Sequence, residues 1–287
     1  MYKIGISTCG NKPTELDGFI AMKSAGIDAA EICKAEYKDV DFKKLRSDAD
    51  AAGIELFSIH SHTHPSFDIS SLDNESNRRA LREYFWLTDK ASEIGIDKII
   101  IHPTNTPEPF DQNTRGEKIK HAMECLDKLA EHAYEKGVTL AVENLPRTCL
   151  ANTIEEHLHI LSANGKLRAC LDLNHCLIDD TVDMIRKLGE KTVTVHISDR
   201  DNINERHWMP GEGVLDWKKI IDAFDSIGYM GVWMYEIGFL PSATIERRLL
   251  TYSDFVTNAK EIFSRKELTV IGTPVPKLGL WGREEQS

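Results

Sequence analysis

The sequence predicts a single-domain α/β protein folded as a (β/α)8 barrel, the TIM-barrel architecture. Two observations carry this prediction: strand-like runs alternate with amphipathic helical stretches along the whole chain, and the strand-like runs are continuously apolar. Continuous apolar runs indicate strands buried on both faces, and strand–helix alternation is typical of a parallel sheet. The length of 287 residues suits one large barrel.

The expected elements form eight strand–helix units. Strands are expected at residues 4–6, 29–33, 54–60, 98–103, 140–146, 171–175, 194–199 and 233–238. Helices are expected near residues 14–25, 41–52, 81–94, 119–133, 153–163, 180–188, 216–227 and 244–264. Glycines such as Gly26, Gly53 and Gly95 recur where a helix ends and the next strand begins. An open doubly wound sheet is the alternative, but residues 7–11 lack its glycine-rich first turn.

The pattern breaks near the end of the chain, at residues 269–276. We therefore expect the barrel to occupy residues 1–265 and a C-terminal tail to occupy residues 266–287. Leu278, Leu280 and Trp281 make this tail too apolar for a fully solvated end. It is expected to pack on the barrel or on a partner subunit. In the second case the protein would be a homo-oligomer.

Composition argues against several classes of protein, nucleic-acid-binding proteins among them, without excluding them. The formal net charge is −11 and no lysine or arginine run occurs, so the electrostatic footprint of a nucleic-acid-binding protein is missing. No apolar stretch is long enough to cross a membrane, and the N-terminal segment resembles a strand rather than a signal peptide. The six cysteines have no C-x-x-C spacing, which suits reduced thiols. We expect a cytoplasmic protein.

Four successive strand-like runs each end in a residue that can bind a metal ion: Glu143, Asp172, His196 and Glu236. In such a barrel the C-terminal ends of all strands face one opening, here called the mouth, so these residues should converge. A lone strand-end carboxylate is more commonly a helix cap or a salt-bridge partner. Four buried termini would compensate one another through a cation. We predict one divalent ion (Mn, Zn, Co, Fe or Mg) and leave a second or third open.

Several histidines and arginines are candidate substrate contacts. At the mouth we expect His60 or His62, His102, His175 and His207, the last delivered by a Pro- and Gly-containing loop that ends where Asp216 can cap a helix. Arg147, Arg200 and Arg206 are candidates to bind a phosphate or carboxylate, with solvated loop arginines as the alternative. His157 and His159 lie in an expected helix and are predicted to be ordinary surface residues.

At these residues the chain resembles the xylose isomerase-like barrels, which include sugar isomerases and epimerases, inosose dehydratases and the endonuclease IV branch. The resemblance covers nearly the whole length. It is carried by Glu143 in Glu-Asn-Leu-Pro, Asp172-x-x-His175, His196 in Val-His-Ile-Ser-Asp, the loop from His207 to Gly213, Asp216-Trp217 and Glu236. It implies one metal held by Glu143, Asp172, His196 and Glu236, proton transfer by Glu143 and Glu236, and substrate contact by His175.

The implied activity is a divalent-metal-dependent isomerase or epimerase of a sugar or sugar phosphate, acting by proton transfer through a metal-stabilised enediolate. The alternatives are an inosose dehydratase-like lyase, a noncatalytic sugar-binding protein and an endonuclease IV-like zinc phosphodiesterase acting on abasic DNA. Endonuclease IV-like members use additional ligands. This chain offers histidines for them, but it carries Glu205 where that branch has Asp and Thr104 where it has Gly. Ketose epimerases that this chain resembles often have an arginine six residues after the metal-binding histidine, and this chain has Asn202 at that position. The size and charge of the substrate therefore stay open.

Overall fold

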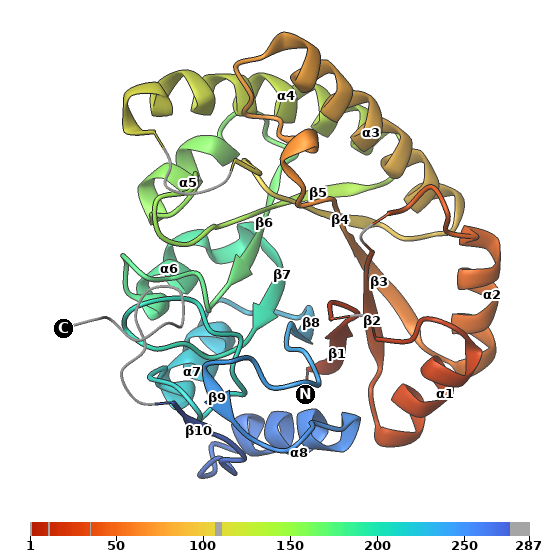
Figure 1. The fold of residues 1–287 in the computed structure, drawn as a ribbon, viewed down its shortest axis with the longest axis vertical. Helices are drawn as coiled ribbons and strands as arrows, with labels where there is room; N and C mark the ends of the chain where they lie inside the picture. Colours follow the sequence, from red (N-terminus) through yellow and green to blue (C-terminus); the bar gives the residue numbers. More distant parts are fainter. Residues whose placement is uncertain (1, 11, 35, 107–110, 276–287) are drawn as a thin grey trace.

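The structure is a computed structural model that describes residues 2–10, 12–34, 36–106 and 111–275. It confirms the closed eight-stranded parallel barrel (Figure 1). Each strand is hydrogen-bonded to the next, and pairing of the first with the eighth closes the ring. The strands are β1 Lys3–Ser7, β2 Ala29–Cys33, β3 Glu55–His60, β4 Lys98–Ile101, β5 Thr139–Glu143, β6 Arg168–Asp172, β7 Thr192–Ile197 and β8 Val232–Tyr235.

In the described part of the chain, eight α-helices surround the strands as an outer layer (Figure 1). They are α1 Leu16–Ala25, α2 Phe42–Ala52, α3 Asn74–Glu93, α4 Arg115–Glu135, α5 Ile154–Leu161, α6 Thr181–Leu188, α7 Trp217–Ser226 and α8 Tyr252–Phe263. Short 3-10 turns lie at Pro65–Phe67, Gln112–Thr114 and Gly189–Lys191. The main apolar core fills the space between the strands and these helices.

Helix ends follow the local chemistry of the sequence. Gly26 and Gly53 adopt left-handed φ values of 100° and 73° after α1 and α2, which confirms their capping role. Asp216 accepts a hydrogen bond from the Lys219 amide and caps α7, as predicted. The third helix begins earlier than expected, because Asp73 accepts hydrogen bonds from the amides of Glu75 and Ser76 and starts α3 there.

The last predicted helix, residues 244–264, was wrong in its first half. That part contains β9 Ile245–Glu246, which pairs antiparallel with β10 Thr273–Pro274, and α8 follows. Leu268 and Ile271, just before β10, contact the main core. The residues singled out in the tail, Leu278, Leu280 and Trp281, lie outside the described residues.

Side chains alternate between the two faces of each strand. On the inner face of the barrel, the residues nearest the mouth are polar and those one step deeper are apolar. Ala29, Ala141, Cys170 and Met234 belong to small buried clusters that are separate from the main core. Residues two positions apart in a strand share a face, so the side chains two positions later continue this inner face toward the mouth. Those side chains are Glu31, Glu143, Asp172 and Glu236.

Among the described residues, no helix has the length and apolar character needed to cross a membrane.

Candidate metal centre

Glu143, Asp172, His196 and Glu236 converge at the mouth. One ligand atom from each lies within 4.8 Å of the corresponding atoms of the others. His196 Nδ1 lies 3.1 Å from Glu143 Oε1, 3.3 Å from Glu236 Oε2 and 3.8 Å from Asp172 Oδ2. Glu236 is the most exposed of the four, and its side chain is only 12% accessible. Side chains contributed by four different strand ends can therefore reach a common atom. These four residues are called the ligand group, or the four-residue group, below.

The environment of Asp172 tests whether this group suits a cation. Its Oδ1 accepts hydrogen bonds from the amides of Asn174 and His175, whereas its buried Oδ2 has no hydrogen-bond donor among the described residues. Burial raises the pKa of Asp172 to about 7. A buried carboxylate oxygen without a donor is costly unless a positive charge faces it. Three carboxylates and one imidazole form a donor set that fits a divalent cation.

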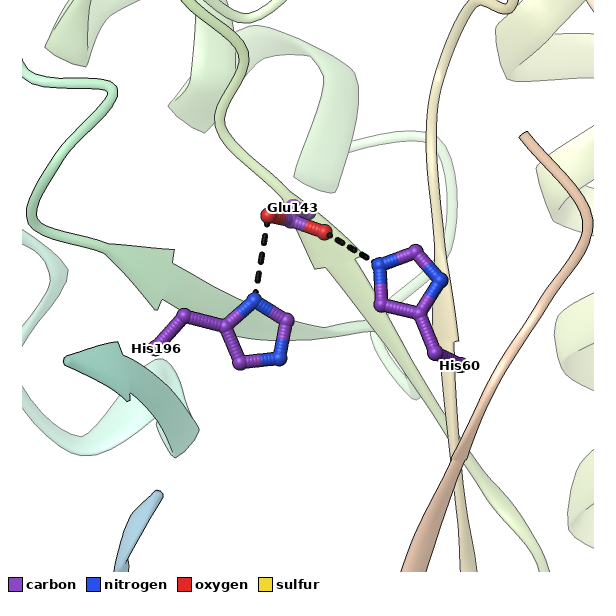
Figure 2. Close-up of side chains that lie close together, drawn as sticks. All are labelled: His60, Glu143 and His196. Atoms are coloured by element: carbon purple, nitrogen blue, oxygen red, sulfur yellow. Dashed lines mark hydrogen bonds and ion pairs between the residues drawn. The ribbon is translucent and has the colours of Figure 1, made fainter. Parts of the chain in front are cut away.

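Glu143 is shared between this group and two further histidines. Its Oε2 lies 3.2 Å from His60 Nε2 and 3.1 Å from His102 Nε2. Figure 2 shows the Glu143 carboxylate between the rings of His60 and His196. Burial would raise the pKa of Glu143, but the charges of His196 and His102 hold it well below the usual range. The structure thus brings His60 and His102 to the mouth beside the predicted ligands.

A second group with ligand character consists of His175, Glu205 and His207. Glu205 Oε2 lies 2.8 Å from His175 Nε2, while His175 Nδ1 lies 2.9 Å from the Asn144 carbonyl oxygen. Burial would lower the pKa of His175, but the charge of Asp172 and the hydrogen bond to Glu205 raise it to about 10. His207 has a φ of 50°, a strained conformation for a residue with a side chain.

The three arginines are not solvated loop residues. Arg147 lies 2.6 Å from both Glu205 Oε1 and Asn204 Oδ1, and its side chain is 15% accessible. Arg200 is buried and donates a hydrogen bond to the carbonyl of Asp201. Arg206 is also buried and pairs with the Asp201 carboxylate. Arg147 therefore supports Glu205 beside the mouth.

A pocket of about 770 Å³ opens at the ends of β1, β2 and β3. His62 is buried in its wall with Nε2 3.3 Å from Glu83 Oε1, whereas His64 is exposed. Of the three clustered histidines, His60 and His62 thus lie inside and His64 lies on the loop surface. Cys9 and Cys33 also line this pocket. The pocket provides space for a small polar molecule at the mouth, although its lining includes none of Glu143, Asp172, His196 and Glu236.

One histidine prediction was wrong. His157 is completely buried, and its Nε2 lies 3.0 Å from the Val142 carbonyl oxygen, whereas His159 is exposed as expected. Burial lowers the pKa of His157 to about 4. The reason is that α5 turns the His157 side of the helix toward β5. His157 therefore supports the strand that carries Glu143.

Asp199 holds the loop between β7 and α7 in place. Its buried carboxylate accepts hydrogen bonds from the amides of Arg200, Gly211 and Leu215 and from Trp217 Nε1. A methyl group on Gly213 would lie 2.2 Å from the Arg200 carbonyl oxygen, so only glycine fits there. This loop carries Glu205 and His207 to the mouth.

Glu31 was not among the residues that the sequence predicted for the site. It is completely buried in β2, and its Oε1 lies 3.1 Å from His196 Nε2. A carboxylate inside an otherwise apolar strand is the sequence signal that could have identified it.

Comparisons with known proteins extend over most of the chain. Among curated proteins, an uncharacterized protein of Sinorhizobium fredii is 22% identical over 185 residues, which cover 62% of this chain and 57% of that protein. The match thus spans less than two thirds of that relative's length. Fructoselysine 3-epimerase of Escherichia coli O157:H7 is 22% identical over 251 residues, which cover 82% of this chain and 90% of that enzyme.

Solved structures share the fold. A D-tagatose 3-epimerase-like protein superimposes with a TM-score of 0.78 at 20% identity, covering 92% of this chain and 97% of that one. An L-ribulose 3-epimerase gives a TM-score of 0.71 at 24% identity, covering 83% and 82%. The model of the family described as xylose isomerase-like TIM barrel matches residues 19–249. The chain therefore belongs to the xylose isomerase-like TIM barrel family.

Proposed function

We propose that the protein is a divalent-metal-dependent sugar isomerase or epimerase. The observation that carries this proposal is the convergence of Glu143, Asp172, His196 and Glu236 on one point at the mouth. These four residues would hold the ion. When bound, the divalent cation would polarise the carbonyl and hydroxyl oxygens of a sugar. Relatives over most of the chain are named as 3-epimerases of sugars or of fructoselysine, which supports the same class of reaction.

Glu143 and Glu236 are the proposed acid/base pair. Both carboxylates approach His196 Nδ1, at 3.1 and 3.3 Å, but they come from β5 and from the end of β8. A substrate between them would meet one carboxylate on each side. One would remove the proton from the carbon beside the carbonyl, and the other would return a proton. Return to the opposite face of the same carbon gives the epimer, and return to the adjacent carbon gives the isomer.

The surrounding side chains are proposed to hold the sugar. The pocket of about 770 Å³ is large enough for a monosaccharide, and His62 lies in its wall. The other proposed contacts are His60, His102, His175, His207 and Arg147, together with Arg200, which is buried in the loop after β7. Buried polar groups of this kind orient hydroxyls and exclude bulk water.

The test is a screen of free and phosphorylated ketoses in deuterium oxide with protein loaded with Mn²⁺, Co²⁺ or Mg²⁺. We expect one solvent deuteron in the product, at the carbon that is inverted or isomerised. Product without deuterium would point to a hydride shift and remove the acid/base roles. A dehydratase would be recognised by loss of water from the sugar.

A second function, an endonuclease IV-like zinc phosphodiesterase, is favoured by one observation. Besides the four-residue group, three other sets among the described residues have ligand atoms close enough to bind a metal: His60 with Glu143 and His196, His175 with Glu205 and His207, and Glu36 with His62 and Glu83. A hydrolase of this type predicts about three zinc ions per chain and cleavage of abasic-site DNA. One bound ion and intact DNA would exclude it.

A further inference from the structure

The buried carboxylate of Glu31 faces the side of His196 that points away from the ligand group. Its Oε1 and Oε2 lie 3.1 and 3.2 Å from His196 Nε2, so both oxygens approach the same ring nitrogen. The two residues are 165 positions apart, and the contact joins β2 to β7 across the inside of the barrel. Both side chains are fully buried.

The position of the Glu31 carboxylate is itself held by a neighbour. Ser58 Oγ on β3 donates a 2.8 Å hydrogen bond to Glu31 Oε2, and Glu31 and Ser58 are register partners in the sheet. Glu31 Oε1 has no hydrogen-bond donor among the described residues apart from its approach to His196. The His60 ring stacks on the His196 ring with a centroid distance of 5.6 Å and an interplanar angle of 17°. These contacts leave the imidazole little freedom to rotate.

An ionised carboxylate only accepts hydrogen bonds, so the ring nitrogen facing Glu31 must carry a proton. A neutral imidazole with its proton on Nε2 has its lone pair on Nδ1. Nδ1 is the atom that lies among the carboxylates of Glu143, Asp172 and Glu236. Glu31 thus selects the tautomer that can donate an electron pair to a cation at that point.

We propose that Glu31 is a positioning residue that sets the tautomer and the ring orientation of His196 for metal binding. This inference rests on the proposed metal centre but is independent of which sugar the enzyme uses. The competing explanation is that the Glu31 carboxylate only fills space inside the barrel and stabilises the packing there. That explanation predicts a loss of stability on substitution without a specific loss of metal affinity.

The experiment compares Glu31→Gln with Asp89→Asn in the full chain. Glutamine has nearly the shape of glutamate, but its NH₂ group can donate to an unprotonated Nε2 and so permit the tautomer with the proton on Nδ1. Asp89 is the control, because its Oδ1 also lies close to a histidine Nε2, 3.0 Å from that of His132, but the pair joins α3 to α4 and belongs to no candidate metal set of the described residues. Mn²⁺ affinity is measured by calorimetry on protein stripped of metal, and folding is checked by urea unfolding.

We expect Glu31→Gln to weaken Mn²⁺ binding by about 10- to 100-fold, and Asp89→Asn to change it by less than about threefold. Affinity of Glu31→Gln within about twofold of the wild type would overturn the inference and leave the proposed function intact. A wild-type protein that binds neither Mn²⁺ nor Zn²⁺ would overturn both. Metal binding without turnover of any sugar would contradict the proposed function alone.

A spectroscopic measurement reports the tautomer of His196 directly and does not depend on the folding of Glu31→Gln; it uses the wild type, with a His196 variant only to assign the signals. In Zn²⁺-loaded protein with ¹⁵N-labelled histidine, His196 is identified by the signals absent from His196→Gln. We expect a protonated Nε2 that exchanges slowly with water and an unprotonated, zinc-shifted Nδ1. A proton on Nδ1, or an unprotonated Nε2, would overturn the inference.

Discussion

Glu205 Oε2 lies 2.8 Å from His175 Nε2, which ties the loop after β7 to the segment after β6. The opposite oxygen of the same carboxylate lies 2.6 Å from Arg147 Nη1, beyond the end of β5. Three successive strand ends are thereby linked by one side chain beside the predicted ligands. The link is either a support for His175 or part of a second metal group, and metal content distinguishes the two.

Glu205→Gln is expected to leave the metal content unchanged at one divalent ion per chain. Glu205 is outside the four-residue group, so its charge is not needed to hold that ion. The measurement is elemental analysis of dialysed wild type and variant. If the wild type holds more than one ion and the variant loses one, the phosphodiesterase candidate gains support.

Glu236→Gln is expected to lower kcat by about 100-fold or more, because an amide cannot exchange the proton that the proposed mechanism requires. The assay follows conversion of whichever ketose the screen identifies. Glu246→Gln is the matched control, since Glu246 is an exposed carboxylate on β9. Unchanged kcat in Glu236→Gln would remove its acid/base role.

Adding Mn²⁺ at about 100 times its dissociation constant is expected to stabilise the wild type by about 2.7 kcal/mol. For a domain of this size that corresponds to a rise in unfolding midpoint of roughly 5 °C. Asp172→Asn should abolish most of this rise, because it replaces the buried oxygen that lacks a hydrogen-bond donor. Scanning calorimetry with and without a chelator checks both; an equal rise in the variant would show that the ion binds elsewhere.

Asp199→Asn is expected to lower the free energy of unfolding by about 1–3 kcal/mol, because the amide NH₂ faces donors that need an acceptor. Four donors converge on this carboxylate. Asp17→Asn, at an exposed site in α1, should change stability by less than about 0.5 kcal/mol. Urea unfolding compares the two. Similar stabilities would mean that the loop is held by other contacts.

His157 should make the protein acid-sensitive. Its folded pKa of about 4 lies below the ordinary value of 6.5, so the unfolded chain binds the extra proton between these values and stability falls as the pH falls through this window. At pH 4.5 the loss is about 2 kcal/mol relative to pH 7.5. His157→Gln, which does not titrate, should lack this part of the pH dependence. Parallel curves of unfolding free energy against pH for the two proteins would refute the assignment.

Much of the fold and of the ligand group could be predicted because both depend on local pattern. The apolar runs and capping glycines specify strands and helices wherever they occur, and eight such units close most simply into a barrel. Closure brings the C-terminal ends of all strands to one mouth, where Glu143, Asp172, His196 and Glu236 lie close together.

Tertiary structure alone decided which side chains meet across that mouth. The contacts of Glu31 with His196 and of Glu205 with His175 join different strand ends, and the contact of His157 with the Val142 carbonyl joins α5 to β5. The periodicity of strands and helices indicates which face a residue occupies. Which side chain it then contacts depends on the register and curvature of the closed barrel. Those quantities result from the packing of all eight units together, and no single stretch of sequence contains them.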